Sequence, residues 1–386
     1  MIKFASIHHP MKKKLNILAL SSWYPKPSDP QEGVFVQQQL QAIQKDHHVT
    51  LILSRPSAKF KIEKTVEENL TTLTIHYASA LSVSKPVNWL FSWRKALSSI
   101  KDEKFDLIHL HVIFPLGIIA LWFQRKLGIP LITTEHWSGY RSKKEYTGSF
   151  RKRITQKVVQ SSKAIIVQSQ FLKGLMEEAG LKGSFSIVPN LVKHLPLLNN
   201  QQFNSRKNIQ ILNIADHIDS DKNISGLLRA LKLSYNQNSN LRFKQIGGGP
   251  DTTFLKSLGN ELNLNNMLEW QGRLKNEEAL EAIQHCDFGV INSRIETFSI
   301  VAFEFLAAGK PIIITHCGGP EEFLQKGFGF FVPVEDNEKM SQAILKMASS
   351  FSELSLENIS QDVRKYFSEN EFRKRINVVY QKVLHD

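Results

Sequence analysis

Two glutamates in the second half of the chain have the type and spacing to bind one polar ligand. In SRIETFSIVAFEFLAAGKP, residues 293–311, seven residues separate Glu296 from Glu304. Glu304 lies in an apolar run, where burying a carboxylate is costly unless something binds it. Carboxylates accept hydrogen bonds from hydroxyl groups, so the pair could bind two parts of one hydroxyl-rich molecule. The alternative is a capping acid plus a surface acid, which the apolar context of Glu304 disfavours.

The residues around the glutamates could form a phosphate site. Thr297 and Ser299 are N-cap candidates for the helix that would carry Glu304. A helix start presents free N–H groups and a partial positive charge, which suit a phosphate. Gly318 and Gly319 follow the next expected strand, and glycine permits close approach of the backbone to a ligand. Two carboxylates flanking a phosphate site suit a sugar nucleotide.

Alternating strand-like and helix-like segments would position these residues. LNILAL, HVTLILS and DFGVINS have the pattern of short buried strands, and FVQQQLQAIQK has that of a helix. Short apolar strands between helices predict α/β structure with parallel sheets covered on both faces. The alternation pauses at the polar stretch 191–208. We therefore expect two doubly wound α/β domains, with ligands beyond the carboxyl ends of the strands.

Length and charge set the class of protein. A chain of 386 residues is too long for one small core, so two domains are expected. The net charge of +13 is uneven, because residues 1–190 carry 27 Lys+Arg and 13 Asp+Glu, whereas the rest carries 22 and 23. Such asymmetry suggests an anionic partner in the first half. Nucleic acid, an anionic lipid surface and an acidic substrate are open alternatives, as is a lysine-rich solvated surface, but no RNP-like or zinc motif supports nucleic acid.

The cysteines and apolar runs favour a reduced, cytoplasmic protein. Cys286 and Cys317 predict buried reduced thiols and no disulfide framework. MKKKLNILAL, which starts at Met11, imitates a signal peptide but has a short apolar core and no cleavage site. The apolar run 107–123 is interrupted by histidine, proline and glycine. We expect no transmembrane helix and no secretion, with translation starting at Met1 or Met11.

An ordered set of motifs resembles the retaining glycosyltransferases of the GT-B fold, the large family four. The most specific is E-x7-E in a helix ending in AAGKP, followed by a strand and GGPEE. The others are SSWYPKPSDPQEGVFVQQQ, FDLIHLH, TTEHWSGY, AIIVQSQFLKGLMEEAG, SIVPN, NIADHIDSDKNISGLLRAL, QIGGGP and QGR, which extend the match over about residues 15–335. The resemblance implies two Rossmann-like domains facing a cleft. Residues 1–195 would bind the acceptor and 196–365 the nucleotide sugar, with a C-terminal helix, 366–386, crossing back.

The resemblance also implies roles for individual residues. Glu296 would bind the hydroxyls of the donor sugar, and Glu304 would bind those of the ribose. Lys222 would neutralise the leaving diphosphate, His136 would lie near the donor sugar, and Gly33 would let the first loop approach the phosphates. The other donor-binding residues expected are Thr297, Phe298, Ser299, Gly318 and Gly319.

One stretch departs from the family pattern. Where the family has Gly-Arg after the first strand of the second domain, this chain has Ala215-Asp216-His217. The missing arginine would share the diphosphate with Lys222, so His217 or Arg273 would have to substitute for it. The loss puts full activity, or the usual donor, in doubt.

Two further motifs are expected to carry no cofactor. Asp219-Ser220-Asp221 resembles the D-x-D of metal-dependent glycosyltransferases, but its place before Lys222 suits a helix start better than a metal site. The glycines of QIGGGP lack the full G-x-G-x-x-G spacing and an acidic ribose partner, so they give NAD little support. We expect no cofactor and no metal.

Aromatic and basic residues in the first half suggest a membrane surface. KPVNWLFSWRKAL, residues 85–97, places Trp89, Leu90, Phe91 and Trp93 beside cations, and residues 141–157 add a basic run. Aromatic residues with flanking cations suit an anionic membrane interface. A core-facing aromatic helix with a solvated basic side explains the pattern equally well.

These features predict a retaining glycosyltransferase that moves a sugar from a nucleotide-diphosphate donor to a hydroxyl of a glycan or lipid-linked acceptor. By resemblance, the acceptor attacks from the front face and the departing diphosphate takes its proton. The expected role is cell-surface polysaccharide or glycolipid synthesis, in the cytoplasm or peripherally on the inner face of the plasma membrane. The alternatives are a GT-B sugar-nucleotide epimerase and a non-catalytic nucleotide-binding scaffold. Donor base, sugar, acceptor, linkage and oligomeric state are left open.

Overall fold

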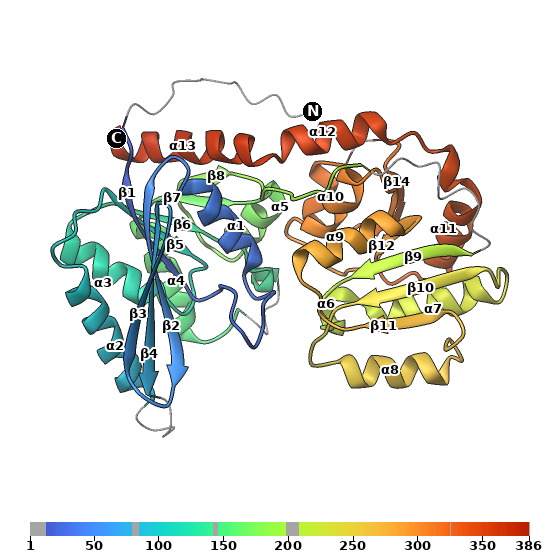
Figure 1. Ribbon diagram of the computed structural model, residues 1–386, viewed down its shortest axis with the longest axis horizontal. Helices are drawn as coiled ribbons and strands as arrows, with labels where there is room; N and C mark the ends of the chain where they lie inside the picture. The colour runs from blue at the N-terminus through green and yellow to red at the C-terminus, as the bar shows by residue number, and fades with distance from the viewer. Residues whose placement is uncertain (1–12, 79–84, 142–145, 198–207, 325, 386) are drawn as a thin grey trace. The chain divides into compact units, whose positions relative to one another are not determined.

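The computed structural model describes residues 13–78, 85–141, 146–197, 208–324 and 326–385. The chain divides into two compact units (Figure 1). Unit 1 comprises Met1–Leu191 and Glu369–Asp386, and unit 2 comprises Val192–Ser368. Each unit has its own sheet and its own core.

Unit 1 is built on an eight-stranded sheet of order β3-β4-β2-β1-β5-β6-β7-β8. Its strands are β1 (Asn16–Ser21), β2 (His48–Ser57), β3 (Lys61–Glu67), β4 (Leu70–Ala78), β5 (Leu107–His111), β6 (Leu131–Thr134), β7 (Ser162–Val167) and β8 (Phe185–Ile187). All neighbouring strands are parallel except β3 and β4, which are antiparallel. The antiparallel strand β3 is almost wholly exposed and rich in charged residues, which suits the edge of a sheet because charge discourages pairing with another chain.

Six α-helices among the described residues belong to unit 1. They are α1 (Val34–Ile43), α2 (Lys85–Ser99), α3 (Gly117–Leu127), α4 (Ser149–Ser161), α5 (Gln170–Glu178) and the C-terminal α13 (Glu369–His385). A short 3-10 helix, Gly139–Arg141, precedes α4. The helix α13 returns to unit 1 after the chain has passed through unit 2.

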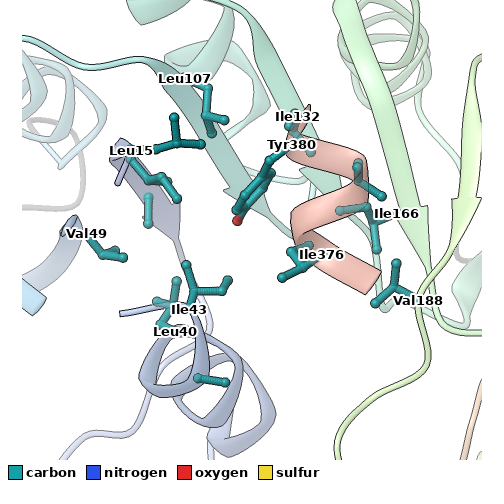
Figure 2. Close-up of a cluster of buried hydrophobic side chains, with 14 of the residues drawn as sticks. Leu15, Leu40, Ile43, Val49, Leu107, Ile132, Ile166, Val188, Ile376 and Tyr380 are labelled. Atoms are coloured by element: carbon teal, nitrogen blue, oxygen red, sulfur yellow. The ribbon is translucent and has the colours of Figure 1, made fainter. Parts of the chain in front are cut away.

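The core between the unit 1 sheet and α13 joins residues far apart in the sequence. Figure 2 shows Ile376 and Tyr380 of α13 among the apolar side chains of the strands and α1. Tyr380 is fully buried, and its hydroxyl lies 2.8 Å from Nδ1 of His109 on β5. Asp46, which follows α1, accepts hydrogen bonds from Arg373 and Asn377 of α13. The last helix is therefore an integral part of this core.

Unit 2 is built on a six-stranded parallel sheet of order β11-β10-β9-β12-β13-β14. Its strands are β9 (Ile209–Ile214), β10 (Leu241–Ile246), β11 (Leu268–Gln271), β12 (Phe288–Ile291), β13 (Ile312–Thr315) and β14 (Gly329–Val332). Its helices are α6 (Asp219–Lys222), α7 (Ile224–Tyr235), α8 (Thr252–Glu261), α9 (Asn276–His285), α10 (Ile300–Ala307), α11 (Asn337–Ser350) and α12 (Glu357–Tyr366), with 3-10 turns at Gly319–Glu322 and Phe351–Glu353. Two apolar clusters, one containing α7, α8 and α11 and the other α9, α10 and α12, cover the sheet.

Each sheet has one place where the strand order reverses direction. In unit 1 the chain builds outward from β1 to β2 and β4, and then returns to β5 on the other side of β1. In unit 2 it builds from β9 to β10 and β11, and then returns to β12. Loops diverge at such a switch point and leave a crevice beyond the carboxyl ends of the two strands, which is where open α/β sheets bind ligands.

The predicted fold class is confirmed, because both units are doubly wound α/β structures. The elements that the sequence interpretation missed include β3, α8, α12 and β14. The strand β3 has mostly polar residues and lacks the apolar pattern of a buried strand. The strand β14, in contrast, reads GFFV, and this short apolar run was available as a signal.

Candidate functional site

The switch point of unit 2 holds a partly buried ion pair between two of the predicted residues. Lys222 ends α6, the short helix after β9, and Glu296 follows β12. The Lys222 Nζ atom lies 2.7 Å from Oε1 of Glu296, which also accepts a hydrogen bond from Ser293 Oγ at 2.7 Å. Burial lowers the pKa of Lys222, but the Glu296 carboxylate outweighs it and the net pKa is raised. Lys222 therefore keeps its positive charge at neutral pH in this arrangement.

Arg294 braces the short helix that carries Lys222, and the sequence interpretation gave it no role. Its guanidinium donates to the carbonyl oxygens of Asp219 and Ser220 and, at 2.8 Å, to Oδ1 of Asn223. Its backbone N–H donates to the Asp221 carbonyl at 2.7 Å. One arginine thus contacts the carbonyl groups of three consecutive residues of α6, at the end of a helix where carbonyl groups commonly lack helical partners. Arg294 lies two residues before Glu296 and contacts the helix that carries Lys222, so it connects the segments that hold the two members of the ion pair. A cation so close in sequence to Glu296 could have been named as a candidate from the sequence.

The loop between Glu296 and α10 is anchored by its aromatic residue. Phe298 is 1% exposed and packs against Phe303 and Phe367, with ring centroids 4.9 and 5.3 Å away. Ser299 occupies the N-cap position of α10 with φ of 60°, but its side chain makes no capping hydrogen bond. Ser299 is therefore the N-cap residue, as predicted, but it does not cap through its side chain, because its left-handed backbone does not direct the hydroxyl onto the first helical N–H groups.

Gly318 and Gly319 bring the loop after β13 onto the loop after β12. The Gly319 N–H donates to the Glu296 carbonyl at 2.9 Å, and the Glu296 N–H donates to the Cys317 carbonyl at 2.9 Å. A Cβ atom at Gly319 would lie 2.0 Å from the Thr297 carbonyl oxygen, and Gly318 has φ of 109°. Only glycine tolerates this approach and this backbone conformation. The glycine pair therefore holds Glu296 in place.

Glu304 lies inside α10 and is buried, with 5% of its surface exposed. Burial raises its pKa to about 7, although a hydrogen bond from the Asn276 side chain and the charge of Lys193 lower it in part. The prediction that Glu304 lies inside the helix in apolar surroundings is confirmed. A carboxylate in this setting is ready to accept hydrogen bonds from a ligand, since its own protein partners compensate the burial only partly.

The stretch that replaces the expected arginine has its own ion pair. Arg273 Nη1 lies 2.8 Å from Oδ1 of Asp216, and Nη2 donates to the Gly248 carbonyl at 2.8 Å. His217 is 1% exposed, and its Nδ1 lies 2.8 Å from Oγ1 of Thr252, while Nε2 has no partner among the described residues. Burial lowers the pKa of His217, so this ring is not a ready cation. Of the two residues suggested to replace the missing arginine, only Arg273 supplies a positive charge, and it is paired with the Asp216 carboxylate.

His136 follows β6 at the carboxyl edge of unit 1, and a buried glutamate holds its loop. The Glu135 Oε1 atom accepts the N–H groups of His136 and Trp137 at 2.8 and 3.0 Å. Its Oε2 atom accepts the N–H of Ile113 and the hydroxyl of Tyr140 at 3.2 and 2.9 Å. Burial raises the pKa of Glu135 despite these bonds. Glu135 therefore links the loops after β5 and β6, although the sequence interpretation did not name it.

The ring of His136 is buried beside other rings. Its ring lies on Phe35 of α1, with centroids 4.4 Å apart. Burial and the nearby His111 hold its pKa well below the usual range, so the imidazole is neutral. Gly33, with φ of 65°, precedes α1, and a Cβ there would meet the Trp23 backbone at 2.4 Å. Glycine is required at this turn because a side chain would clash with the loop after β1.

The aromatic segment of α2 is divided between core and solvent. Trp93 is fully buried and packs on Phe123 of α3, which agrees with the core-facing alternative for this residue and contradicts the membrane-interface alternative. Leu90 and Phe91 are about half exposed, at 49% and 50%. Part of the predicted basic run, residues 142–145, lies outside the described residues.

The described part of the chain has neither a candidate membrane span nor a candidate metal cluster. No helix there is long and apolar enough to span a membrane. No cluster of three or more histidine, cysteine, aspartate or glutamate side chains there could hold a metal ion. Cys286 and Cys317 are both buried and free.

The chain is similar to known glycosyltransferases along most of its length. The family Glycosyl transferases group 1 matches residues 198–371, and Glycosyltransferase Family 4 matches residues 33–194. Alpha-monoglucosyldiacylglycerol synthase of Streptococcus pneumoniae is 24% identical, over 74% of this chain and 68% of that protein. Lipopolysaccharide 1,2-N-acetylglucosaminetransferase of Salmonella typhimurium is 29% identical, over 51% of this chain and 60% of that protein. The structure of HepE from Anabaena in complex with UDP and glucose matches 95% of this chain and 100% of that chain, with a TM-score of 0.75 and 15% identity.

Proposed function

Because this chain belongs to the group 1 glycosyltransferases of the GT-B fold, we propose that it is a retaining enzyme that uses a nucleotide-diphosphate sugar. It moves the sugar to a hydroxyl of a glycan or lipid-linked acceptor. The observation that carries the proposal is the Lys222–Glu296 pair, at 2.7 Å, at the switch point of unit 2. A cation and a hydroxyl-binding carboxylate side by side suit the junction between a diphosphate and a sugar.

Lys222 and the start of α10 suit the developing charge of a leaving diphosphate. The bond between the anomeric carbon and the diphosphate oxygen breaks, and the acceptor oxygen bonds to the same face of that carbon. The acceptor proton passes to the departing diphosphate oxygen, so no protein base is needed. Lys222 stabilises the negative charge that leaves with the diphosphate, which is the kind of electrostatic contribution that counts most in such steps. This route needs no metal ion and no cofactor.

Glu304 suits the other end of the donor. It lies four residues into α10, beyond the loop that carries Glu296. Its buried carboxylate, with pKa raised to about 7, gains hydrogen-bond donors when ribose hydroxyls bind. The two glutamates would thus bind the two hydroxyl-bearing parts of the donor, with the diphosphate between them.

The relatives support the substrate class. HepE of Anabaena binds UDP and glucose in its crystal structure. One relative is named for glucosyldiacylglycerol synthesis and another for lipopolysaccharide synthesis. A UDP-sugar donor and an acceptor from glycolipid or cell-surface polysaccharide assembly are therefore the first substrates to try.

A thermal-shift screen tests the donor proposal. UDP, GDP and ADP and their common sugar conjugates are added to the wild type and to Glu304→Ala. A ligand at 100 times its dissociation constant stabilises the folded state by ~2.7 kcal/mol. We expect one nucleotide family to stabilise the wild type and to lose that effect in the variant. No binding at millimolar concentration would overturn the proposal.

The Asp216–Arg273 pair favours a second candidate, a nucleotide-binding scaffold without turnover. Asp216 stands where the family has a diphosphate arginine, and it neutralises part of the charge on Arg273. Nucleotide binding without transfer to any glycan or lipid-linked acceptor would support the scaffold. Conversion of the donor to another sugar nucleotide without acceptor would instead identify an epimerase.

An exposed apolar patch in unit 1 suits peripheral contact with an anionic membrane on its cytoplasmic face. We define the α2 patch as Phe60, Val87, Leu90 and Phe91, which are 42–67% exposed. The rings of Phe60 and Phe91 have centroids 6.0 Å apart, and Lys95 Nζ lies 5.3 Å from the Phe91 centroid. Apolar groups bordered by cations bind anionic lipid through both burial and charge.

Vesicle co-sedimentation tests the membrane proposal. The wild type should bind anionic vesicles at low salt better than neutral ones, and Leu90→Ser with Phe91→Ser should lose the difference. Phe254→Ser, which alters an exposed phenylalanine in unit 2 (52% exposed), is the matched control. Equal binding of the wild type to both kinds of vesicle would contradict the proposal.

A further inference from the structure

Two histidines on β5 are neighbours with opposite hydrogen-bonding states. Their rings lie 4.1 Å apart, and both are at least 99% buried. His109 uses both ring nitrogens, one to the Tyr380 hydroxyl at 2.8 Å and one to the Thr134 hydroxyl at 2.7 Å. His111 has no partner for either nitrogen among the described residues. A buried polar group without partners costs stability and needs an explanation.

The position of His111 points to a ligand. It is the last residue of β5 and pairs in register with Ser21, the last residue of β1. These two strands form the switch point of unit 1, where ligands bind in open α/β sheets. The ring is close enough to His136 to lower the pKa of that residue. His111 therefore lies where a substrate is expected.

The backbone beyond His111 is strained and fixed. Val112 has φ of 64°, a left-handed conformation that is unfavourable for a β-branched residue. Its N–H donates to the Thr134 carbonyl at 2.8 Å, and the next N–H, of Ile113, donates to Glu135. Strain held in place by neighbouring bonds is found mostly at functional sites. The turn thus fixes the end of β5 at a local energetic cost.

A second buried side chain without partners lies two strands away. Gln168 follows β7 directly, is fully buried, and has no partner for its amide oxygen or nitrogen among the described residues. The strand between β5 and β7 is β6, which leads to His136. Three neighbouring strand ends therefore bring His111, His136 and Gln168 to the same edge of the sheet.

We propose that His111 and Gln168 hydrogen-bond hydroxyl groups of the carbohydrate that binds at this edge, which extends the proposed function to residues that contact substrate in unit 1. A neutral imidazole offers one donor and one acceptor, and an amide offers both as well. A sugar hydroxyl also donates and accepts, so it matches either group. The carbohydrate is the donor sugar or the acceptor. Contact requires the side chains that cover this edge to move on binding, as closing sites commonly do.

The test uses substitutions that separate ligand contact from core packing. His111→Phe and Gln168→Leu keep the approximate size but remove the buried polar atoms. If these groups bind substrate, both variants should unfold at the wild-type temperature or higher yet lose at least tenfold in kcat/KM. The control is His109→Phe, which breaks two hydrogen bonds and should lower the unfolding temperature.

Separate assays identify the bound group. A raised KM in hydrolysis of UDP-glucose without acceptor assigns the contact to the donor sugar, and a raised KM only for the acceptor assigns it there. His111→Phe and Gln168→Leu with kcat/KM within twofold of an active wild type would overturn the proposal. If the wild type turns over no donor, the proposed function fails. In that case, NMR of the imidazole nitrogens tests the His111 contact by itself, with saturating UDP-glucose and methyl α-glucoside as the added ligands. A shift of the His111 signals supports the contact with carbohydrate, and unchanged signals overturn it.

Discussion

The two switch points of this protein use opposite chemistry. In unit 2 the loops after β9 and β12 hold a charged pair, Lys222 and Glu296, with Nζ and Oε1 2.7 Å apart. In unit 1 the corresponding edge holds His111 and the nearby His136, which burial keeps neutral by lowering the pKa of His111 to about 3 and that of His136 well below its usual range. One edge is suited to charge, and the other to uncharged hydroxyl groups.

This difference indicates how a reaction could be divided between two similar folds. A diphosphate needs a cation, and a cation inside a fold needs a counter-charge until the ligand arrives. Sugar hydroxyls donate and accept hydrogen bonds, so a neutral histidine can bind them in either direction, whereas a charged histidine can only donate. A doubly wound topology can therefore serve either purpose, since the residues at the strand ends determine the chemistry and the sheets do not.

Removal of the lysine should have the largest effect. Lys222→Met removes the cation that we propose faces the leaving diphosphate, and we expect turnover to fall by about 10²–10³-fold, the range for one lost electrostatic contact. Lys339→Met, an exposed lysine at the start of α11, should leave turnover unchanged. Steady-state kinetics with the identified donor measures both. Turnover within threefold of wild type in Lys222→Met would show that the charged edge does not stabilise the leaving group.

Glu296→Gln should separate binding from turnover. The substitution keeps the shape but releases Lys222 from its counter-charge. Turnover should fall about 100-fold, since a hydroxyl-binding carboxylate is lost, whereas UDP alone should bind as tightly as to wild type or more tightly. Calorimetric titration with UDP gives the affinity. A parallel loss of UDP affinity would mean that Glu296 does not compete with the diphosphate for Lys222.

Glu304→Gln should change the dependence of stability on pH. The folded pKa of Glu304 is about 7, above its usual 4.5, so the folded state retains a proton that the unfolded state loses. The contribution of this proton to stability is complete below pH 4.5 and declines as pH rises toward 7, by on the order of 3 kcal/mol. Urea unfolding at pH 5, 6, 7 and 8 should show the wild type losing stability relative to the variant. If the free energies of unfolding of the wild type and the variant changed in parallel with pH, the raised pKa of Glu304 would be contradicted.

Asp216→Ala should have the smallest effect. It removes the carboxylate that lies 2.8 Å from Arg273. Arg273 then presents more positive charge near the diphosphate loop, and UDP should bind a few-fold more tightly, as expected for a partly exposed pair. The gain should disappear at high salt. Weaker UDP binding in this variant would show that Asp216 positions the diphosphate loop instead of neutralising the charge of Arg273.

Much of the fold could be predicted because its signals are local. Short apolar strands between amphipathic helices predicted α/β structure in both halves, and the strands β1, β2, β4, β9 and β12 occur where the pattern indicated. The edge strand β3 was missed because its residues are mostly polar. The orientation of α2 also could not be predicted, since Trp93 and Phe91 have similar character and only packing against the sheet sends one inward.

The sequence alone determined the candidate residues, because glutamates at a fixed spacing, a lysine before a helix and paired glycines are visible as letters. The tertiary structure decided their partners. Lys222 meets Glu296 across 74 residues of sequence, and the Tyr380 hydroxyl reaches His109 across 271. Which of two histidines in the same strand is bonded, and which is left without a partner, depends on such distant contacts. Local pattern specifies secondary structure, whereas hydrogen bonding and charge in a site depend on which strand ends the topology brings together.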